Sequence, residues 1–169
     1  MEFDEVLMTR RSIRSFLDDP VDKTTVEAVL RAAMAAPSAG NQQPWHFVVV
    51  RDRATMDEIR QVHEYSDMLT TAPVCIAVCA ELALEKFEGF WVQDTSAAMQ
   101  NMLLKARDLE LGSVWLGVHP IESRQEGLQR ILNLPDGVVC LGLMALGRTE
   151  TPFSSADRFK PERVHLETW

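Results

Sequence analysis

The stretch from Phe90 to about Leu111 most restricts how this chain of 169 residues can fold. It is the longest helix candidate in the sequence, and its apolar side chains, among them Trp91, Met99 and Leu103, wrap most of the way around. A helix that is apolar on nearly all sides is either central to its domain or held between two protomers. We favour a homodimer, because this helix is too apolar for a lone monomer.

Helices and apolar strands are expected to alternate along the rest of the chain. Helices are predicted over residues 3–9, about 22–35 with Asp22 as the cap, 54–63 and 121–132, and strands over 45–50, 74–80, 113–116 and 138–146. The run at 74–80 is apolar throughout, so we expect a central strand covered on both faces. The pattern predicts one α/β (α+β) domain over residues 1–169, with a mixed sheet flanked by helices on both faces.

Charge and composition exclude several classes of partner. The net charge of −8 repels polyphosphate backbones, so nucleic acid is not expected, and any phosphate site must be local. No stretch is long and apolar enough to span a bilayer, and Met1–Glu5 lacks the basic start of a signal peptide, so we expect a cytoplasmic protein without a membrane partner. Cys75, Cys79 and Cys140 lie in apolar runs and are expected as buried thiols. The histidines have no ligand spacing, so no metal site is predicted.

Residues 36–45 join the second helix to the first strand and are rigid at both ends. Pro37 and Pro44 restrict the backbone, while Gly40 permits a conformation that other residues resist. Between them lie Ser38 and three amides, at positions 41, 42 and 43. Amides donate and accept hydrogen bonds, which suits recognition of a planar heterocycle with carbonyls and ring nitrogens. The alternative is a solvated turn before a strand.

The run Arg10-Arg11-Ser12-Ile13-Arg14 places three guanidiniums within five residues. They repel one another unless an anion lies between them, and a phosphate matches their donors. In an extended segment, Arg10, Ser12 and Arg14 share one face. The alternative is that these arginines remain solvated and complement the dipole of the preceding helix.

Other signatures of catalysis are missing. The chain contains neither a Gly-x-Gly-x-x-Gly nor a Gly-x-x-x-x-Gly-Lys pattern, and its serines have no nucleophile-elbow context. Asp94 and Glu88 flank the long helix and are interpreted as a cap or surface charges. We therefore expect no catalytic side chain, and chemistry carried by a cofactor that the protein positions.

Four stretches, residues 10–16, 36–47, 115–117 and 146–148, resemble the FMN-dependent nitroreductase family, in the right order over nearly the whole chain. The resemblance implies an intertwined homodimer with a mixed, mainly antiparallel sheet and two FMN molecules at the interface. It also implies that the polar, partly aromatic tail, about 149–169, packs on the partner subunit.

The resemblance also implies which residues contact FMN. Arg10 and Ser12, with Arg11 alongside, would hold the phosphate, and Arg14 would lie nearer the pyrimidine edge. The loop would reach the flavin of the other protomer, and the turn at 116–117 would present backbone N–H groups near N5 and O4. Arg148 and Arg158 are the candidates to complete the phosphate site. The full set of expected contacts is Arg10, Arg11, Ser12, Arg14, Pro37, Ser38, Ala39, Asn41, Gln43, Leu116, Gly117, Gly147, Arg148 and Arg158.

The implied activity is that of an oxidoreductase. Electrons would pass from NADH or NADPH through FMN to a nitroaromatic, quinone or similar small-molecule acceptor, in a ping-pong cycle. Two alternatives are open: a related flavoenzyme that performs dehalogenation or flavin fragmentation, and a flavin-binding storage or sensor protein without turnover. The region 63–73 leaves little room for the helical excursion that often covers the substrate in longer members.

Overall fold

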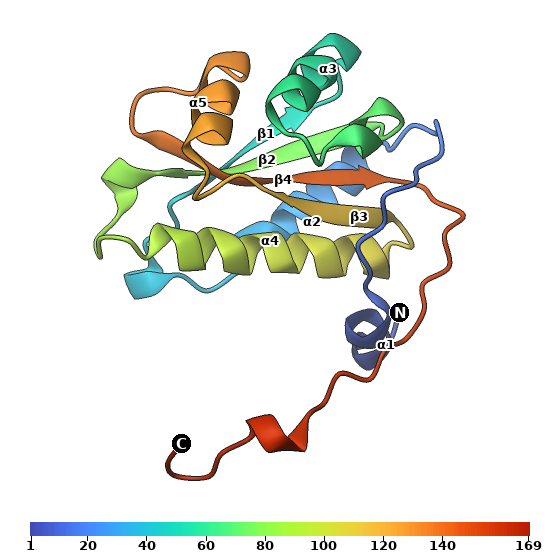
Figure 1. Ribbon diagram of the computed structural model, residues 1–169, viewed down its shortest axis with the longest axis vertical. Helices are drawn as coiled ribbons and strands as arrows, with labels where there is room; N and C mark the ends of the chain where they lie inside the picture. The colour runs from blue at the N-terminus through green and yellow to red at the C-terminus, as the bar shows by residue number, and fades with distance from the viewer.

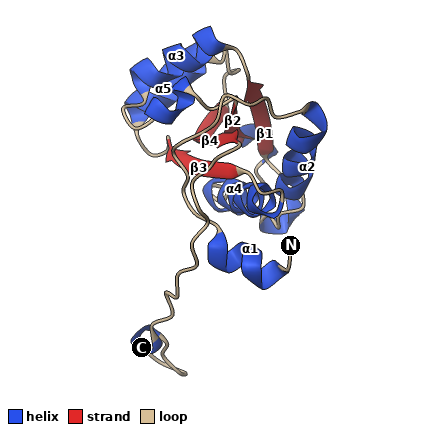
Figure 2. Ribbon diagram, turned by 90° about the vertical axis from the view of Figure 1, so that its right-hand side faces the viewer, coloured by secondary structure: helices blue, strands red, loops and turns tan.

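The computed structural model describes all 169 residues and contains a four-stranded sheet between two layers of helices (Figure 1). The elements, in chain order, are α1 (Phe3–Thr9), α2 (Lys23–Met34), β1 (Trp45–Val50), α3 (Arg53–Val62), β2 (Val74–Glu81), α4 (Trp91–Asp108), β3 (Gly112–Gly117), α5 (Glu122–Ile131) and β4 (Val138–Gly147). Helices α2 and α4 cover one face of the sheet and α3 and α5 the other, as Figure 2 shows. The predicted layers are confirmed.

The sheet has the strand order β1-β2-β4-β3, and all neighbouring strands pair antiparallel. A single parallel contact extends it, because Ser12 bridges Ser113 and the Ile13 N–H donates to the Ser113 carbonyl at 2.9 Å. The segment after α1 therefore runs along the outer edge of β3. This confirms the predicted mixed, mainly antiparallel sheet, and it places the arginine-rich run beside an edge strand.

Strand β2 lies inside the sheet and contributes to both cores, as its uniform apolar sequence predicts. Successive side chains of a strand point to opposite faces. Ile76 and Val78 accordingly pack towards α2 and α4, whereas Cys75 and Cys79 pack towards α3 and α5. All three cysteines are buried, as predicted. Burial raises the pKa of the Cys75 thiol to about 12, so this thiol stays protonated and unreactive.

Helix α4 is central to the domain. It runs along one face of the sheet and packs against α2 (Figure 1), with Ala98, Met99 and Met102 fully buried. This bears out one of the two alternatives drawn from its apolar sequence, and the homodimer remains a prediction. The helix ends at Asp108, somewhat before the predicted Leu111, and Gly112 already belongs to β3. It ends when Glu110 adopts a positive φ of 58°, while the Leu111 N–H donates to the Ala106 carbonyl at 2.9 Å.

The tail beyond β4 is attached at its root and then leaves the body of the protein (Figures 1 and 2). The Phe153 ring is half-buried, with the Arg107 guanidinium 4.2 Å from its centre. Residues 157–169 are exposed, and Trp169 stacks on His165 of the same tail, with ring centres 4.4 Å apart. Packing of this tail on a partner subunit remains a prediction. Among the helices, none combines the length and apolarity that a membrane crossing needs.

Candidate functional site

Three of the predicted arginine contacts surround one cavity at the junction of α1 and the tail. Arg10 and Arg11 follow α1, and Arg158 lies beside them around a volume of about 280 Å³. Burial, together with the like charges of Arg11 and Arg158, lowers the pKa of the Arg10 guanidinium. One carboxylate lines the cavity, that of Asp157, which accepts a hydrogen bond from the Phe159 N–H at 3.0 Å. An anion between the guanidiniums would relieve their repulsion, so the donor set fits a phosphate.

The residues that follow continue along the edge of β3 in an extended path, as predicted. Ile13 is buried, whereas Ser12 and Arg14 on either side of it are exposed, so these two side chains share the outer face. Arg11 also has a local role, because its guanidinium donates to the carbonyls of Arg10 at 2.6 Å and Met8 at 3.0 Å. The interpretation as a helix-end arginine thus describes Arg11, and Arg10 is the guanidinium left for a ligand.

The structure separates the two candidates for the last phosphate contact. Arg158 lines the arginine cavity, whereas Arg148 does not. Arg148 is exposed directly after β4, and its carbonyl accepts a hydrogen bond from the Leu17 N–H at 2.9 Å. The preceding Gly147 is buried, and a Cβ there would lie 2.7 Å from the Pro73 Cδ atom. Gly147 therefore permits close packing of the chain, and the geometry favours Arg158 for anion binding.

The loop between α2 and β1 is tied to the start of α4 by a buried carboxylate. Asp94 accepts hydrogen bonds from the Ala39 N–H at 2.9 Å and from Gln42 Nε2 at 2.6 Å. The interpretation of Asp94 as a cap or surface charge is wrong, because this residue is only 4% exposed. Two donors satisfy its oxygens, and the side chain lies in the first turn of α4 without capping it. Its partners lie more than fifty residues away in sequence, so no local pattern reveals them.

The loop itself has an unusual backbone. Gly40, Asn41 and Gln43 all have positive φ, between 47° and 54°. The Ser38 hydroxyl accepts a hydrogen bond from the Gln43 N–H at 3.0 Å, and Asn41 Oδ1 accepts one from Gln43 Nε2 at the same distance. Asn41 and Gln43 are exposed, whereas Gln42 points inward and is 7% exposed. Two of the three amides therefore face outward on a constrained loop, and the third has a structural role.

The turn after β3 is held by two side chains that the sequence did not single out. Leu116 is buried in the sheet, while Gly117 is exposed. The Gly117 carbonyl accepts a hydrogen bond from Arg124 Nη1 at 2.9 Å, and the His63 ring nitrogen Nε2 lies 2.9 Å from it. Arg124 also lines a cavity of about 450 Å³ between α3 and the start of α5. Arg124 thus joins this turn to a polar cavity, and Gly117 is the more exposed of the two residues in the turn.

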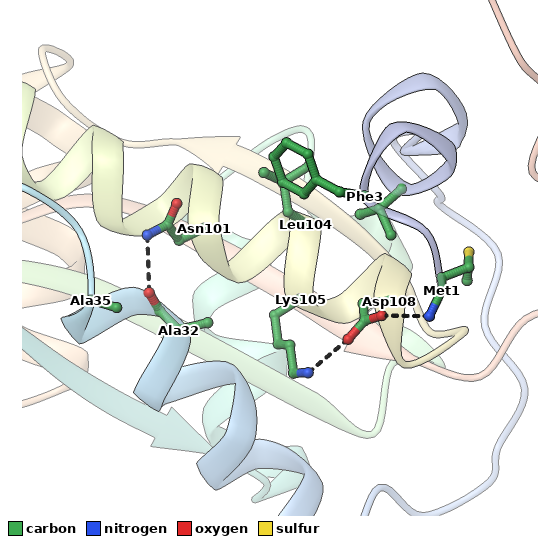
Figure 3. Close-up of a pocket in the computed structure, with 9 residues that line it drawn as sticks. Met1, Phe3, Ala32, Ala35, Asn101, Leu104, Lys105 and Asp108 are labelled. Carbon is green, nitrogen blue, oxygen red and sulfur yellow. Dashed lines mark hydrogen bonds and ion pairs between the residues drawn. The ribbon is translucent and has the colours of Figure 1, made fainter.

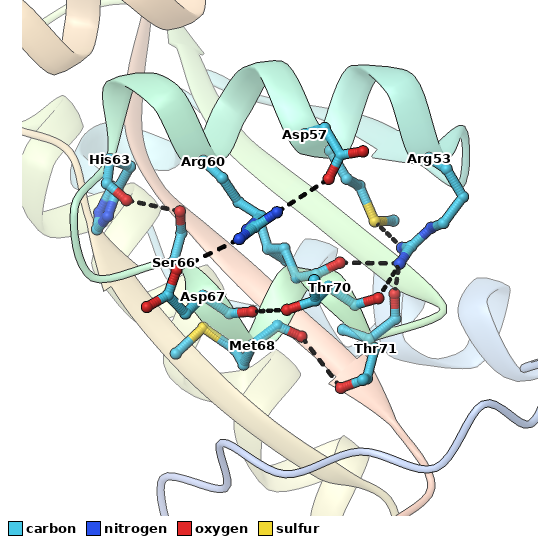
Figure 4. Close-up of polar contacts among 12 residues, drawn as sticks. Arg53, Asp57, Arg60, His63, Ser66, Asp67, Met68, Thr70 and Thr71 are labelled. Atoms are coloured by element: carbon cyan, nitrogen blue, oxygen red, sulfur yellow. Dashed lines mark hydrogen bonds and ion pairs between the residues drawn. The ribbon is translucent and has the colours of Figure 1, made fainter.

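His63 belongs to the polar network that closes the connection from α3 to β2 (Figure 4). Its carbonyl accepts a hydrogen bond from the Ser66 hydroxyl at 2.6 Å, and Arg53 donates to the carbonyls of Leu69 and Ala72. Burial lowers the pKa of the His63 imidazole, so the ring is neutral near pH 7. A short turn over Asp67–Thr70 fills the remaining space. The region predicted to leave little room for a helical excursion thus contains one short helical turn.

Comparison with known proteins identifies the family. The model of the Nitroreductase family matches residues 7–148. The chain belongs to the nitroreductase family. A protein of Methanothermobacter thermautotrophicus, provisionally named NADH dehydrogenase/NAD(P)H nitroreductase, is 46% identical over 169 residues, which cover 100% of this chain and 88% of that protein.

Solved structures support the same assignment. A protein of Parabacteroides distasonis with the same provisional name has a TM-score of 0.95 at 32% identity, over 99% of this nitroreductase-family chain and 98% of that one. A provisionally named nitroreductase from Desulfovibrio desulfuricans, solved in complex with FMN, has a TM-score of 0.86 at 30% identity, over 100% of this chain and 98% of that one.

A further cavity, of about 370 Å³, lies between α1, α2 and α4 (Figure 3). It is mainly apolar, with Phe3 and Leu104 in its wall. Its charges compensate one another, because Asp108 binds the terminal amino group at 3.1 Å and the Lys105 ammonium at 2.7 Å. None of the predicted site residues lines it, so it is separate from the arginine cavity.

Proposed function

We propose that this chain is an FMN-dependent oxidoreductase that uses NADH or NADPH to reduce nitroaromatic compounds, quinones or similar acceptors. The observation that carries the proposal is the cavity where Arg10, Arg11 and Arg158 meet with a single carboxylate, because this donor set fits the phosphate of FMN. Two relatives support FMN and NAD(P)H as the coenzymes. One was solved in complex with FMN, and the other is provisionally named an NAD(P)H nitroreductase.

The side chains bind and orient, and none has to act as an acid, base or nucleophile. Arg10 and Arg158 hold the phosphate, while Ser12 and Arg14 continue along the same exposed face. A guanidinium near the pyrimidine edge favours negative charge there. Gly117 supplies a backbone N–H at the exposed turn. When bound, FMN would supply the redox chemistry that couples oxidation of NAD(P)H to reduction of the acceptor in a ping-pong cycle.

We also propose that the functional unit is a cytoplasmic homodimer. Ser38, Ala39 and Asn41, with the flanking Pro37 and Gln43, contact the flavin of the other protomer. The outward-facing amides of the loop support this arrangement, as does the end of the tail, where Phe159, Val164 and Leu166 are largely exposed. The three unpaired cysteines suit a reducing compartment such as the cytoplasm.

Absorbance spectra of the purified protein test the proposed function. We expect a yellow protein with the visible bands of FMN, bleached under anaerobic conditions by NADH or NADPH and restored by a quinone or nitroaromatic acceptor. A yellow protein that neither nicotinamide bleaches would instead support the storage or sensor alternative. A colourless protein that takes up no added FMN would contradict all flavin-based functions.

A further inference from the structure

Asp94 and Gln42 form a buried pair whose polar atoms are all satisfied by the loop and by the segment before α4. The Asp94 carboxylate receives the Ala39 N–H and Gln42 Nε2, as described above. Gln42 Oε1 in turn accepts from the backbone N–H groups of Lys86, at 2.8 Å, and Phe87, at 3.2 Å. Asp94 forms no ion pair. The loop is thus joined to residues 86–87 through two side chains that solvent barely reaches.

The chemistry of this chain of hydrogen bonds requires one carboxylate and one amide, in either order. Its ends are backbone N–H groups, those of Ala39 on one side and of residues 86–87 on the other, and these can only donate. Each end therefore needs an acceptor, and the contact between the two side chains needs one donor. One carboxylate and one amide meet this requirement. Two amides leave a donor facing a donor, and two carboxylates place two negative charges together.

We propose that Asp94 and Gln42 are positioning residues for the flavin, holding Ser38–Asn41 in the shape that receives the ring without touching it themselves. The inference rests on the proposed function. Positive φ at Asn41 and Gln43 is costly for a free chain and persists only where the surroundings impose it. The buried pair is anchored directly beside these residues, at Ala39 and Gln42, so it supplies that restraint.

The test uses the full-length chain and three variants: Asp94→Asn, Gln42→Glu and the double variant. Asp94→Asn places two amide donors opposite each other, and Gln42→Glu places two carboxylates opposite each other, so each single change disrupts the contact between the two side chains. In the double variant, the amide introduced at position 94 donates to the carboxylate introduced at position 42, which also accepts from residues 86 and 87, so every bond can form again. We expect each single variant to raise the FMN dissociation constant roughly tenfold or more, and the double variant to return within about threefold of wild type. Quenching of FMN fluorescence measures these constants.

Asp52→Asn is the matched control, because Asp52 also accepts two hydrogen bonds, from the Thr55 N–H and hydroxyl, both at 2.8 Å, at the start of α3. We expect it to leave FMN affinity unchanged. Amide hydrogen exchange of the FMN-free proteins provides a second readout, with faster exchange over residues 38–43 in the single Asp94 and Gln42 variants and wild-type exchange in the double variant.

The outcomes separate this inference from the proposed function. A wild-type protein that binds no FMN overturns the proposed function and the inference with it. A wild-type protein that binds FMN, together with folded single variants of unchanged affinity, overturns the positioning role alone. If the single variants do not fold, the double variant decides: near-wild-type FMN affinity supports the inference, and a folded protein with a dissociation constant more than about tenfold higher contradicts it.

Discussion

Arg158 of the tail lies close enough to Arg10 at the end of α1 that its positive charge helps to lower the pKa of the Arg10 guanidinium. Burial is the larger cause, and Arg11 adds to the effect. Two segments from opposite ends of the sequence thus bring like charges to one cavity. Such an arrangement is unfavourable when empty, and it becomes favourable once an anion neutralises it.

We predict that Arg10→Ala weakens FMN binding by about 1.5–3 kcal/mol, the range for a hydrogen bond to a charged group. Arg158→Ala should also weaken binding, because it removes a second guanidinium from the same cavity. Arg148→Ala is the control and should bind FMN as wild type does, since Arg148 lies outside that cavity. Fluorescence titration distinguishes these results. If Arg148→Ala weakened FMN binding and Arg158→Ala did not, Arg148 rather than Arg158 would be the phosphate contact.

A second prediction concerns Gly40. A Cβ there would lie 2.5 Å from Phe87 Cε2, and the residue has a φ of 52°. Gly40→Ala should therefore cost more stability than Gly89→Ala, which has a φ of 82° but nothing within 4 Å of an added Cβ. We expect about 1 kcal/mol for backbone strain alone at Gly89. Urea unfolding of Gly40→Ala in a Phe87→Ala background should show only that cost, and a larger cost would exclude the ring as its cause.

A third prediction concerns pH. Burial lowers the pKa of His63 below its ordinary value of 6.5, so in that range the unfolded chain binds a proton more readily than the folded one. The contribution of His63 to stability is complete above pH 6.5 and is lost as the pH falls through the lower folded pKa. His63→Gln should flatten this part of the profile. Urea unfolding at about pH 7.5 and about pH 5.5 measures it, and equal slopes for both proteins would contradict the prediction.

The tail supplies a fourth prediction. Deleting residues 160–169 removes only exposed residues and keeps Arg158. The shortened chain should keep its fold. Its dimer should have a higher dissociation constant than the wild-type dimer, because the exposed apolar side chains are expected to pack on the partner. Sedimentation velocity at several concentrations, with circular dichroism as the check on folding, measures both effects. A dimer of unchanged strength would show that the last ten residues do not contribute to it.

The elements of the fold could be predicted because their signals are local. Apolar spacing marks the helices, a continuous apolar run marks β2, and Pro73 and Pro120 mark breaks before the elements that follow them. Asp22 begins α2 as predicted, accepting a hydrogen bond from the Thr25 N–H at 2.7 Å. The end of α4 was less predictable, because Glu110 rather than a glycine adopts the positive φ.

The parts of the site that escaped prediction depend on partners distant in sequence. Asp94 resembles any acidic residue in a first helical turn until Ala39 and Gln42 are known to lie against it. The sequence does not show that the His63 ring contacts the Gly117 carbonyl, because the two residues are 54 positions apart. Arg148 and Arg158 both follow β4, and only the path of the tail shows which one returns to the arginine cavity.

The contact between Phe153 and Arg107 gives the tail a fixed point of departure. From that root, residues 154–169 can extend at most about 54 Å, at roughly 3.4 Å per residue. Within this segment, Arg158 lies near the start, and the exposed apolar side chains of Leu166 and Trp169 lie near the end. If Arg158 binds FMN and the end of the tail packs on a partner subunit, as proposed, the contact between Phe153 and Arg107 supports both, and weakening it should impair both at once.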